Sequence, residues 1–195
     1  MNWLVRVMAK KLAPGTNWLQ TTAVRVTRVH FLYIAAYVLS IIVFDSWNLY
    51  THEAVSELWT AVGILLAINT VLWYLARMKF SNNTIYIAIV LILIAADIIF
   101  AAYNVFWQRG LASKAVALFA IPIVTAAVLR SRSTLLATAT LSAAAYSIVS
   151  VRYFYLNYGE SFRVELYGTV GFYSALFFVL AGLLMVIIQP RAERF

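Results

Sequence analysis

The sequence predicts an all-α integral membrane protein with six transmembrane helices. Of its 195 residues, 64% are apolar and only 11% are charged, and the mean hydropathy is +0.87. A soluble domain carries about 25% charged residues. Windows of about twenty apolar residues, which cross a bilayer as a helix, also recur along the chain. The six predicted spans are residues 29–50, 58–76, 84–106, 115–129, 134–152 and 168–189.

The segment before the first span, residues 1–28, is predicted to be an amphipathic arm. It places apolar side chains on one helical face and Arg6 and Lys10 on the other, which suits a short helix lying in the inner membrane interface. An arm without regular structure is the alternative. The bundle itself is expected to cover residues 29–189, and a short basic cytoplasmic tail to follow at 190–195.

The distribution of basic residues predicts that both termini are cytoplasmic. In this orientation 11 of the 15 Lys and Arg residues lie inside, and the four outside are Arg109, Lys114, Arg152 and Arg163. The net charge of +8 is then explained by basic inner loops, and no nucleic-acid partner is expected. We therefore expect a multi-pass protein of the cytoplasmic membrane, the cell's inner membrane, with the lipid bilayer as its first partner.

The fourth, fifth and sixth spans have distinct compositions. The fourth is short, so Lys114 and Arg130 are expected to snorkel at its ends. The fifth and sixth are rich in small residues, which let helices approach closely, either within the bundle or against a protein partner or a second copy of the chain. These residues are Ala137, Thr138, Ala139, Ser142, Ala143 and Ser147, followed by Gly171, Ala175 and Gly182.

The outer end of the bundle is predicted to form a mouth. Residues 152–168 are the longest loop, and we expect a broken interfacial helix there, hinged near Gly159. Asp45 and Arg152 are expected at a similar depth, where they can form an ion pair. The outer-mouth candidates are Asp45, Trp47, Trp107, Arg152 and Tyr155.

Asp97 lies almost at the centre of the third span. An ionised aspartate at mid-bilayer costs roughly 2.5–3.5 kcal/mol, so polar groups from other helices are expected around it. Pro122 should contribute by leaving the Leu118 carbonyl without a helical partner. The layer is expected to be either a proton-titrating or ligand-binding site or an interhelical hydrogen-bond clasp. Its candidate residues are Asp97, Asn69, Asn104, Tyr146, Ser147 and Pro122, with Ser40 at a similar depth.

Motifs for catalysis and metal binding are absent from the sequence. His30 and His52 are predicted to bracket the first span, about 33 Å apart along a helix, which is too far to share one metal ion. There is no cysteine, and no metalloprotease, hydrolase, phosphate-loop or dinucleotide motif is present. We therefore expect no enzymatic activity and no metal, and the only cofactors considered are a quinone or a lipid.

The order of features after Asp97 resembles the multi-span membrane input regions of bacterial sensor histidine kinases. Asp97 is followed by an outer turn with Gly110 and Ser113, a Pro122-Ile123 span, a basic inner turn at residues 130–132, and a small-residue span ending at Tyr146. The resemblance covers residues 30–189 and implies an input module without the phosphoacceptor helix and the ATP-binding domain. In the redox-responsive branch of such kinases the outer turn is implicated in quinone sensing, although a paired glycine is usual there.

Together these observations predict a non-enzymatic sensory or adaptor module. It would sense a small apolar ligand, a quinone or a proton state, and would signal through a partner by shifting the packing of the fifth and sixth spans. Two alternatives remain open. The chain can instead be an accessory subunit of a larger membrane complex, or a small transporter or channel in which Asp97 is the coupling residue.

Overall fold

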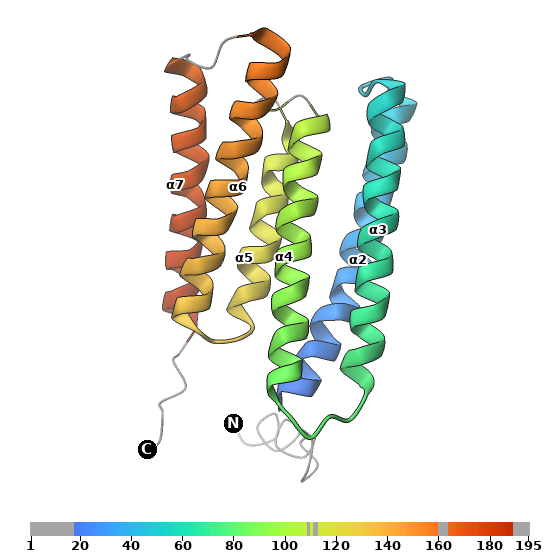
Figure 1. Cartoon of the computed structure of the whole chain (residues 1–195), viewed down its shortest axis with the longest axis vertical. Coiled ribbons are helices and arrows are strands. Elements are labelled where there is room, and N and C mark those ends of the chain that lie inside the picture. The colour runs from blue at the N-terminus through green and yellow to red at the C-terminus, as the bar shows by residue number, and fades with distance from the viewer. Residues whose placement is uncertain (1–17, 109, 111–112, 160–163, 189–195) are drawn as a thin grey trace, which may run out of the picture.

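The structure is a computed structural model that describes residues 18–108, 110, 113–159 and 164–188, and every regular element in this part of the chain is a helix (Figure 1). Five helices are long and apolar enough to cross a membrane, which indicates a multi-pass membrane protein. The elements are α2 (Trp18–Ser46), α3 (His52–Arg77), α4 (Thr84–Trp107), the 3₁₀ helix η2 (Lys114–Phe119), α5 (Ala120–Ala127), α6 (Arg132–Tyr158) and α7 (Val164–Ile187).

The first long helix begins earlier than the sequence predicted. α2 starts at Trp18, so residues 18–28 form its first turns rather than part of an arm, while residues 1–17 lie outside the described residues. The reason is that Arg25 and Arg28 occupy exposed positions on a helix whose other face is buried. A hydropathy window averages over both faces and therefore stops at these arginines.

The short fourth segment is two helices joined end to end. The change from η2 to α5 falls at Phe119 and Ala120, where the Ala120 N–H donates to the carbonyls of Ala117 and Leu118. Pro122 lies in the first turn of α5, and the Leu118 carbonyl accepts from the Ala120 N–H although residue 122 has no N–H to donate. The expectation that Pro122 would leave the Leu118 carbonyl without a partner is corrected by this arrangement.

α6 extends beyond the predicted fifth span and ends where a turn residue allows it. The helix continues from residue 152 to Tyr158, and Gly159 caps it in the left-handed conformation, with φ of +67° and its N–H donated to the Tyr155 carbonyl. The predicted hinge near Gly159 is therefore a helix C-cap. The segment between 160 and 163 lies outside the described residues.

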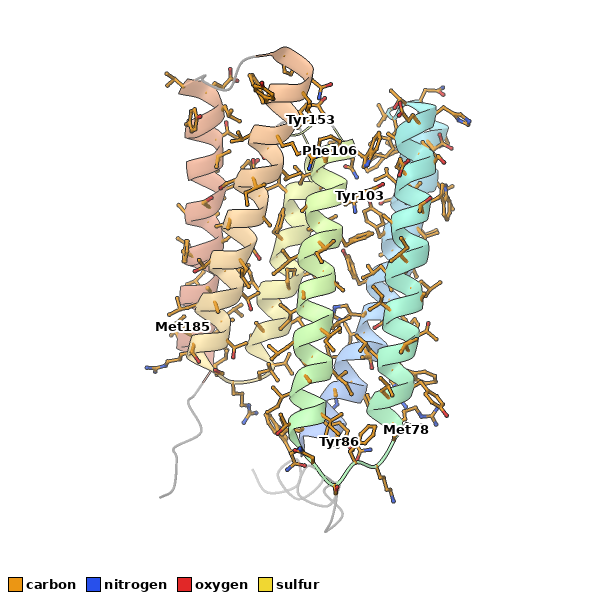
Figure 2. The ribbon with its side chains drawn as sticks, in the orientation of Figure 1. Met78, Tyr86, Tyr103, Phe106, Tyr153 and Met185 are labelled. Carbon is orange, nitrogen blue, oxygen red and sulfur yellow. The ribbon has the colours of Figure 1, made fainter. Side chains whose placement is uncertain are left out.

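α4 is the central helix of the bundle. In Figure 1, α2 and α3 stand on one side of it and α5, α6 and α7 on the other, and α4 packs against α2, α3, η2, α5 and α6. We call the end where α2 begins and α7 ends the basal end, and the opposite end, where α2 ends and α7 begins, the apical end. Figure 2 shows the side chains that fill the space between these helices.

The small residues of the fifth and sixth spans have different roles. On α6, Thr138, Ala139 and Ser142 are buried inside the bundle, where they allow neighbouring helices to pack closely. On α7, Gly171 and Gly182 are exposed, and a Cβ added at either would meet no atom within 4 Å. The α6 face is thus used within the chain, whereas the α7 glycines face outward.

Gly110 provides the first test of this fold. Its φ is +61°, and an added Cβ would lie 2.5 Å from Tyr153 Cδ1. The left-handed conformation alone costs a non-glycine residue about 1–2 kcal/mol, so Gly110→Ala is expected to lower the melting temperature of the detergent-solubilised protein. Gly63→Ala is the matched control, because Gly63 is helical and nothing lies within 4 Å of its added Cβ. Equal melting temperatures for the two variants would contradict the described turn.

Candidate functional site

A polar seam runs along the contact between α2 and α4. His30 pairs with Asp97, Tyr33 packs edge-on against Phe100, and Tyr37 donates to Asn104. In each of the three pairs the two residues are 67 positions apart in the sequence. Because the offset is constant, α2 and α4 are parallel, and their contacts repeat at the alternating spacing of three and four residues seen in coiled coils.

The centre of this seam is a buried histidine–aspartate pair. His30 Nε2 lies 2.8 Å from Asp97 Oδ2, and the two residues are only 4% and 1% exposed. The other ring nitrogen of His30, Nδ1, lies 3.0 Å from the Val26 carbonyl oxygen one turn earlier. Both residues lie near the middle of their helices, so the ionisable group that the sequence places deep in the membrane has an ionisable partner.

The hydrogen bonds of His30 determine how many protons the pair holds. A carbonyl oxygen only accepts, so Nδ1 carries a proton and donates it to Val26. The contact between Nε2 and Oδ2 then needs one further proton, held either by an imidazolium or by a carboxylic acid. Both arrangements are neutral overall. A neutral pair avoids the cost of a net buried charge, and this explains how the two groups remain in an apolar bundle.

α3 adds a second polar contact beside the pair. The Asn69 side chain is fully buried and donates its Nδ2 to the Thr27 carbonyl of α2 at 3.1 Å. Among the described residues, no hydrogen-bond donor reaches Oδ1 of Asn69 or Oδ1 of Asp97. Each of these buried oxygens can therefore accept from a further donor, which is unusual because buried polar atoms are nearly always paired.

Above the pair, an aromatic layer separates it from a second polar group. The Phe100 ring lies 6.3 Å from the Tyr33 ring and 5.0 Å from the Tyr37 ring, centroid to centroid. Beyond Phe100, the Tyr37 hydroxyl donates to Asn104 Oδ1 and accepts from Gln108 Nε2 at 3.1 Å. The polar seam is thus interrupted once, by apolar ring surface.

Each end of the seam opens to a surface hollow. The basal groove, of about 650 Å³, lies between α2, α5 and the end of α7, and His30 is among its lining residues. The apical pocket, of about 580 Å³, lies between α2, α4 and α6, and Gln108 is among its lining residues. The His30–Asp97 pair therefore borders the basal groove, whereas the Tyr37–Asn104–Gln108 group borders the apical pocket.

The predicted mid-membrane residues fall into three groups. Asp97, Asn69 and Asn104 are buried along the α2 side of α4, as just described. Tyr146 instead lies among the rings of Phe119, Tyr173 and Phe177. The remaining members make local contacts: the Ser147 hydroxyl donates to the Ala143 carbonyl, the Ser40 hydroxyl donates to the Tyr37 carbonyl, and Pro122 is buried within α5. Within the described chain, the hydrogen bond to Asp97 comes from His30.

The predicted outer-mouth residues are dispersed over the apical end. Trp107 lines the apical pocket, whereas Trp47 and Tyr155 are exposed. Asp45 and Arg152 are both exposed, and among the described residues the only contact at ion-pair distance is that of His30 with Asp97. The expected Asp45–Arg152 ion pair is therefore corrected: the two side chains lie on α2 and α6, which are on opposite sides of α4.

Three residues of the site were missed by sequence reasoning: His30, Tyr37 and Gln108. His30 was placed at the membrane interface because the first span was predicted to begin at residue 29. The signal that could have found it is the shared spacing of seven residues, from His30 to Tyr37 and from Asp97 to Asn104, which aligns two polar positions on each helix.

The apical pocket combines aromatic walls with hydrogen-bond donors. The walls of the apical pocket include Phe44, Phe106 and Trp107, with Lys114 and Gln108 as donors, and Lys114 Nζ lies 5.2 Å from the centre of the Phe44 ring. Such a pocket suits a planar ring with polar substituents. The expected quinone stays a prediction. The described residues contain no group of three or more metal-ligating side chains.

No protein-family model, curated protein or solved structure matches this chain. The resemblance to the input regions of sensor histidine kinases therefore stays a prediction.

The proton count predicts how substitutions at Asp97 will behave. Asp97→Asn can donate an amide N–H to His30 Nε2, so it keeps a neutral hydrogen bond and should change stability by less than about 1 kcal/mol. Asp97→Ala leaves His30 Nε2 buried without a partner and should cost about 1–3 kcal/mol. Denaturant titration in detergent micelles measures both. A loss for Asp97→Asn as large as that for Asp97→Ala would contradict a neutral pair that shares one proton.

Proposed function

We propose that this chain is a non-enzymatic membrane sensory or adaptor module whose input is the proton state of the His30–Asp97 pair. The observation that carries the proposal is the buried contact of 2.8 Å between His30 Nε2 and Asp97 Oδ2, which requires a proton, in a pair that borders a surface groove. A module of this kind signals through a partner protein, as the sequence resemblance also implies.

The proposal includes a six-span topology with both ends in the cytoplasm. α2 begins and α7 ends beside the same basal groove, which supports an even number of crossings between residues 18 and 188. The crossing that adds to the five long helices is then Lys114–Ala127, fourth in chain order, which is apolar and short. The basal end holds Arg25, Arg28, Arg130 and Arg132, which supports a cytoplasmic location for that end.

Loss of the shared proton is the proposed switching event. Without it, the two ring nitrogens of His30 share one proton, so either the contact with Asp97 or the contact with the Val26 carbonyl loses its hydrogen bond, and the pair carries a net negative charge. A buried charge at this depth costs roughly 2.5–3.5 kcal/mol, which is enough to change a two-state equilibrium by about a hundredfold. The expected response is that α2 moves relative to α4 and the pair becomes hydrated through the basal groove.

The surroundings of the pair contain few other groups that titrate. On α2, the buried Tyr33 lies one turn from His30, and its ring is 6.0 Å from the imidazole. Arg25 and Arg130 line the basal groove with His30. The neighbouring polar residues Asn69 of α3 and Thr125 of α5 are neutral. A pH response of the contact between α2 and α4 is therefore assigned to the pair.

The distance between α2 and α4 should depend on pH. The chain has no cysteine, so nitroxide labels can be placed on Leu32→Cys and Ile99→Cys, whose parent side chains are 72% and 69% exposed. We expect the label-to-label distance in nanodiscs to change when the pH is raised from 6 to 9. Asp97→Asn, which holds a hydrogen bond without a titrating proton, should abolish the change.

Asp45→Asn is the matched control for this experiment. It removes a carboxylate from an exposed position near the end of α2, away from the pair, and should leave the pH response intact. The proposed proton sensor would be overturned if the label-to-label distance did not change with pH in the labelled chain that keeps Asp97. It would also be overturned if the change persisted in Asp97→Asn.

A proton-coupled transporter is the second candidate. It is favoured by one observation: the His30–Asp97 pair borders the basal groove but is separated from the apical pocket by the Phe100 layer, as expected of a site open to one side.

Proteoliposomes separate the two functions. With pyranine inside the vesicles and a potassium-diffusion potential across the membrane, a sensor should show the same proton flux as empty vesicles. Flux above that background that vanishes in Asp97→Asn and persists in Asp45→Asn would support the transporter and contradict the sensor.

A further inference from the structure

The basal groove combines apolar walls with a basic rim. Its apolar lining includes Val29 and Ile187, which are 59% and 74% exposed, and Val124, which is 48% exposed. Arg25 from α2 and Arg130 from the turn after α5 line the same groove. The groove is therefore open on the surface of the bundle, and its two cations come from different elements.

Neither arginine has an acidic partner in the described part of the chain. No residue that lines the groove is acidic, and the described carboxylates other than Asp97 lie toward the apical end, on Asp45, Glu53, Glu57 and Glu165. The Arg130 guanidinium instead stacks over the Trp18 ring, with its carbon 5.6 Å from the ring centre. Two unneutralised cations beside an apolar surface favour an anionic amphiphile.

The backbone at Arg130 provides a second, independent observation. Its φ is +54°, a left-handed conformation that glycine or asparagine adopts more cheaply. The Arg130 N–H donates to the Ala127 carbonyl, and Ser131 then caps α6, so the turn itself needs no arginine side chain. An arginine in this position costs about 1–2 kcal/mol of backbone strain. Its side chain lines the basal groove.

We propose that the basal groove is a binding site for an anionic phospholipid of the cytoplasmic leaflet. Arg25 and Arg130 bind the phosphate of the headgroup, while the acyl chains lie along Val29, Val124 and Ile187. The Trp18 ring lies at the level of the headgroup, where tryptophan is favoured. The site lies beyond the proposed sensing function, because neither arginine takes part in the His30–Asp97 hydrogen bond.

Charge distinguishes this occupant from the chain's own ends. Residues 1–17 carry Arg6, Lys10 and Lys11 and no acidic residue, so that segment would be repelled by the two arginines. Residues 189–195 hold two arginines and one glutamate. A phospholipid provides both the negative charge and the apolar chains that the groove requires.

Native mass spectrometry of the delipidated full chain tests the site directly. We expect phosphatidylglycerol to bind at least tenfold more tightly than phosphatidylcholine, since the latter carries no net charge. Arg25→Gln together with Arg130→Gly should weaken phosphatidylglycerol binding at least tenfold. Arg28→Gln and Arg132→Gln are the matched controls: they remove one charge each from α2 and α6 but do not line the groove, so binding should change less than threefold.

Arg130→Gly alone separates binding from folding. Glycine relaxes the left-handed backbone, so the melting temperature should stay the same or rise while phosphatidylglycerol affinity falls. Loss of affinity accompanied by an equal loss of thermal stability would instead mean that Arg130 is only structural, and would overturn the site. An equal loss of affinity in the Arg28 and Arg132 controls would show diffuse attraction to the basal end and would also overturn it.

Two further arms identify the ligand and separate this site from the sensor. Inorganic phosphate at millimolar concentration should not displace phosphatidylglycerol, because it makes no contact with the apolar walls. Displacement would assign the groove to a free anion. Asp97→Asn should leave lipid affinity unchanged. The proton sensor is therefore tested by Asp97→Asn, and the lipid site is tested separately by the variants of Arg25 and Arg130.

Discussion

A single proton between His30 Nε2 and Asp97 Oδ2 is the constraint on which the rest of the bundle depends. The Val26 carbonyl fixes the protonation of the opposite ring nitrogen, so this shared proton makes the pair neutral. Neutrality is what allows two ionisable side chains to lie in the middle of apolar helices. The pair also sets the alignment of α2 and α4, which the Tyr33–Phe100 and Tyr37–Asn104 contacts continue toward the apical end.

The two sides of α4 differ in chemistry. The side facing α2 and α3 carries hydrogen bonds between helices, through Asp97 and Asn104 to α2 and from Asn69 of α3 to α2. The side facing α5, α6 and α7 is held by apolar contacts and by the rings around Tyr146. The basal groove lies where these two sides meet, since its walls come from α2 on one side and from α5 and α7 on the other.

The sequence was sufficient for the helical class, and it placed the third span at 84–106, within one residue of α4. It also showed that Asp97 needs a partner, but not which one. Counting residues from a membrane boundary gives the depth of a side chain, not the direction in which it points. Tyr146 therefore matched Asp97 in depth yet packs among other rings. His30 was missed because exposed arginines on the first turns of α2 moved the predicted boundary to residue 29.

In the proposed six-span topology, the short length of the fourth crossing has a consequence for the surrounding lipid. η2 and α5 together hold six and eight residues, a length of about 24 Å, against roughly 30 Å of hydrocarbon in an average bilayer. In that topology, acyl chains that contact the exposed residues of this segment, such as Val124, must compress or tilt to match its length. A bundle with one crossing shorter than the bilayer would partition toward thin membranes and would deform thick ones.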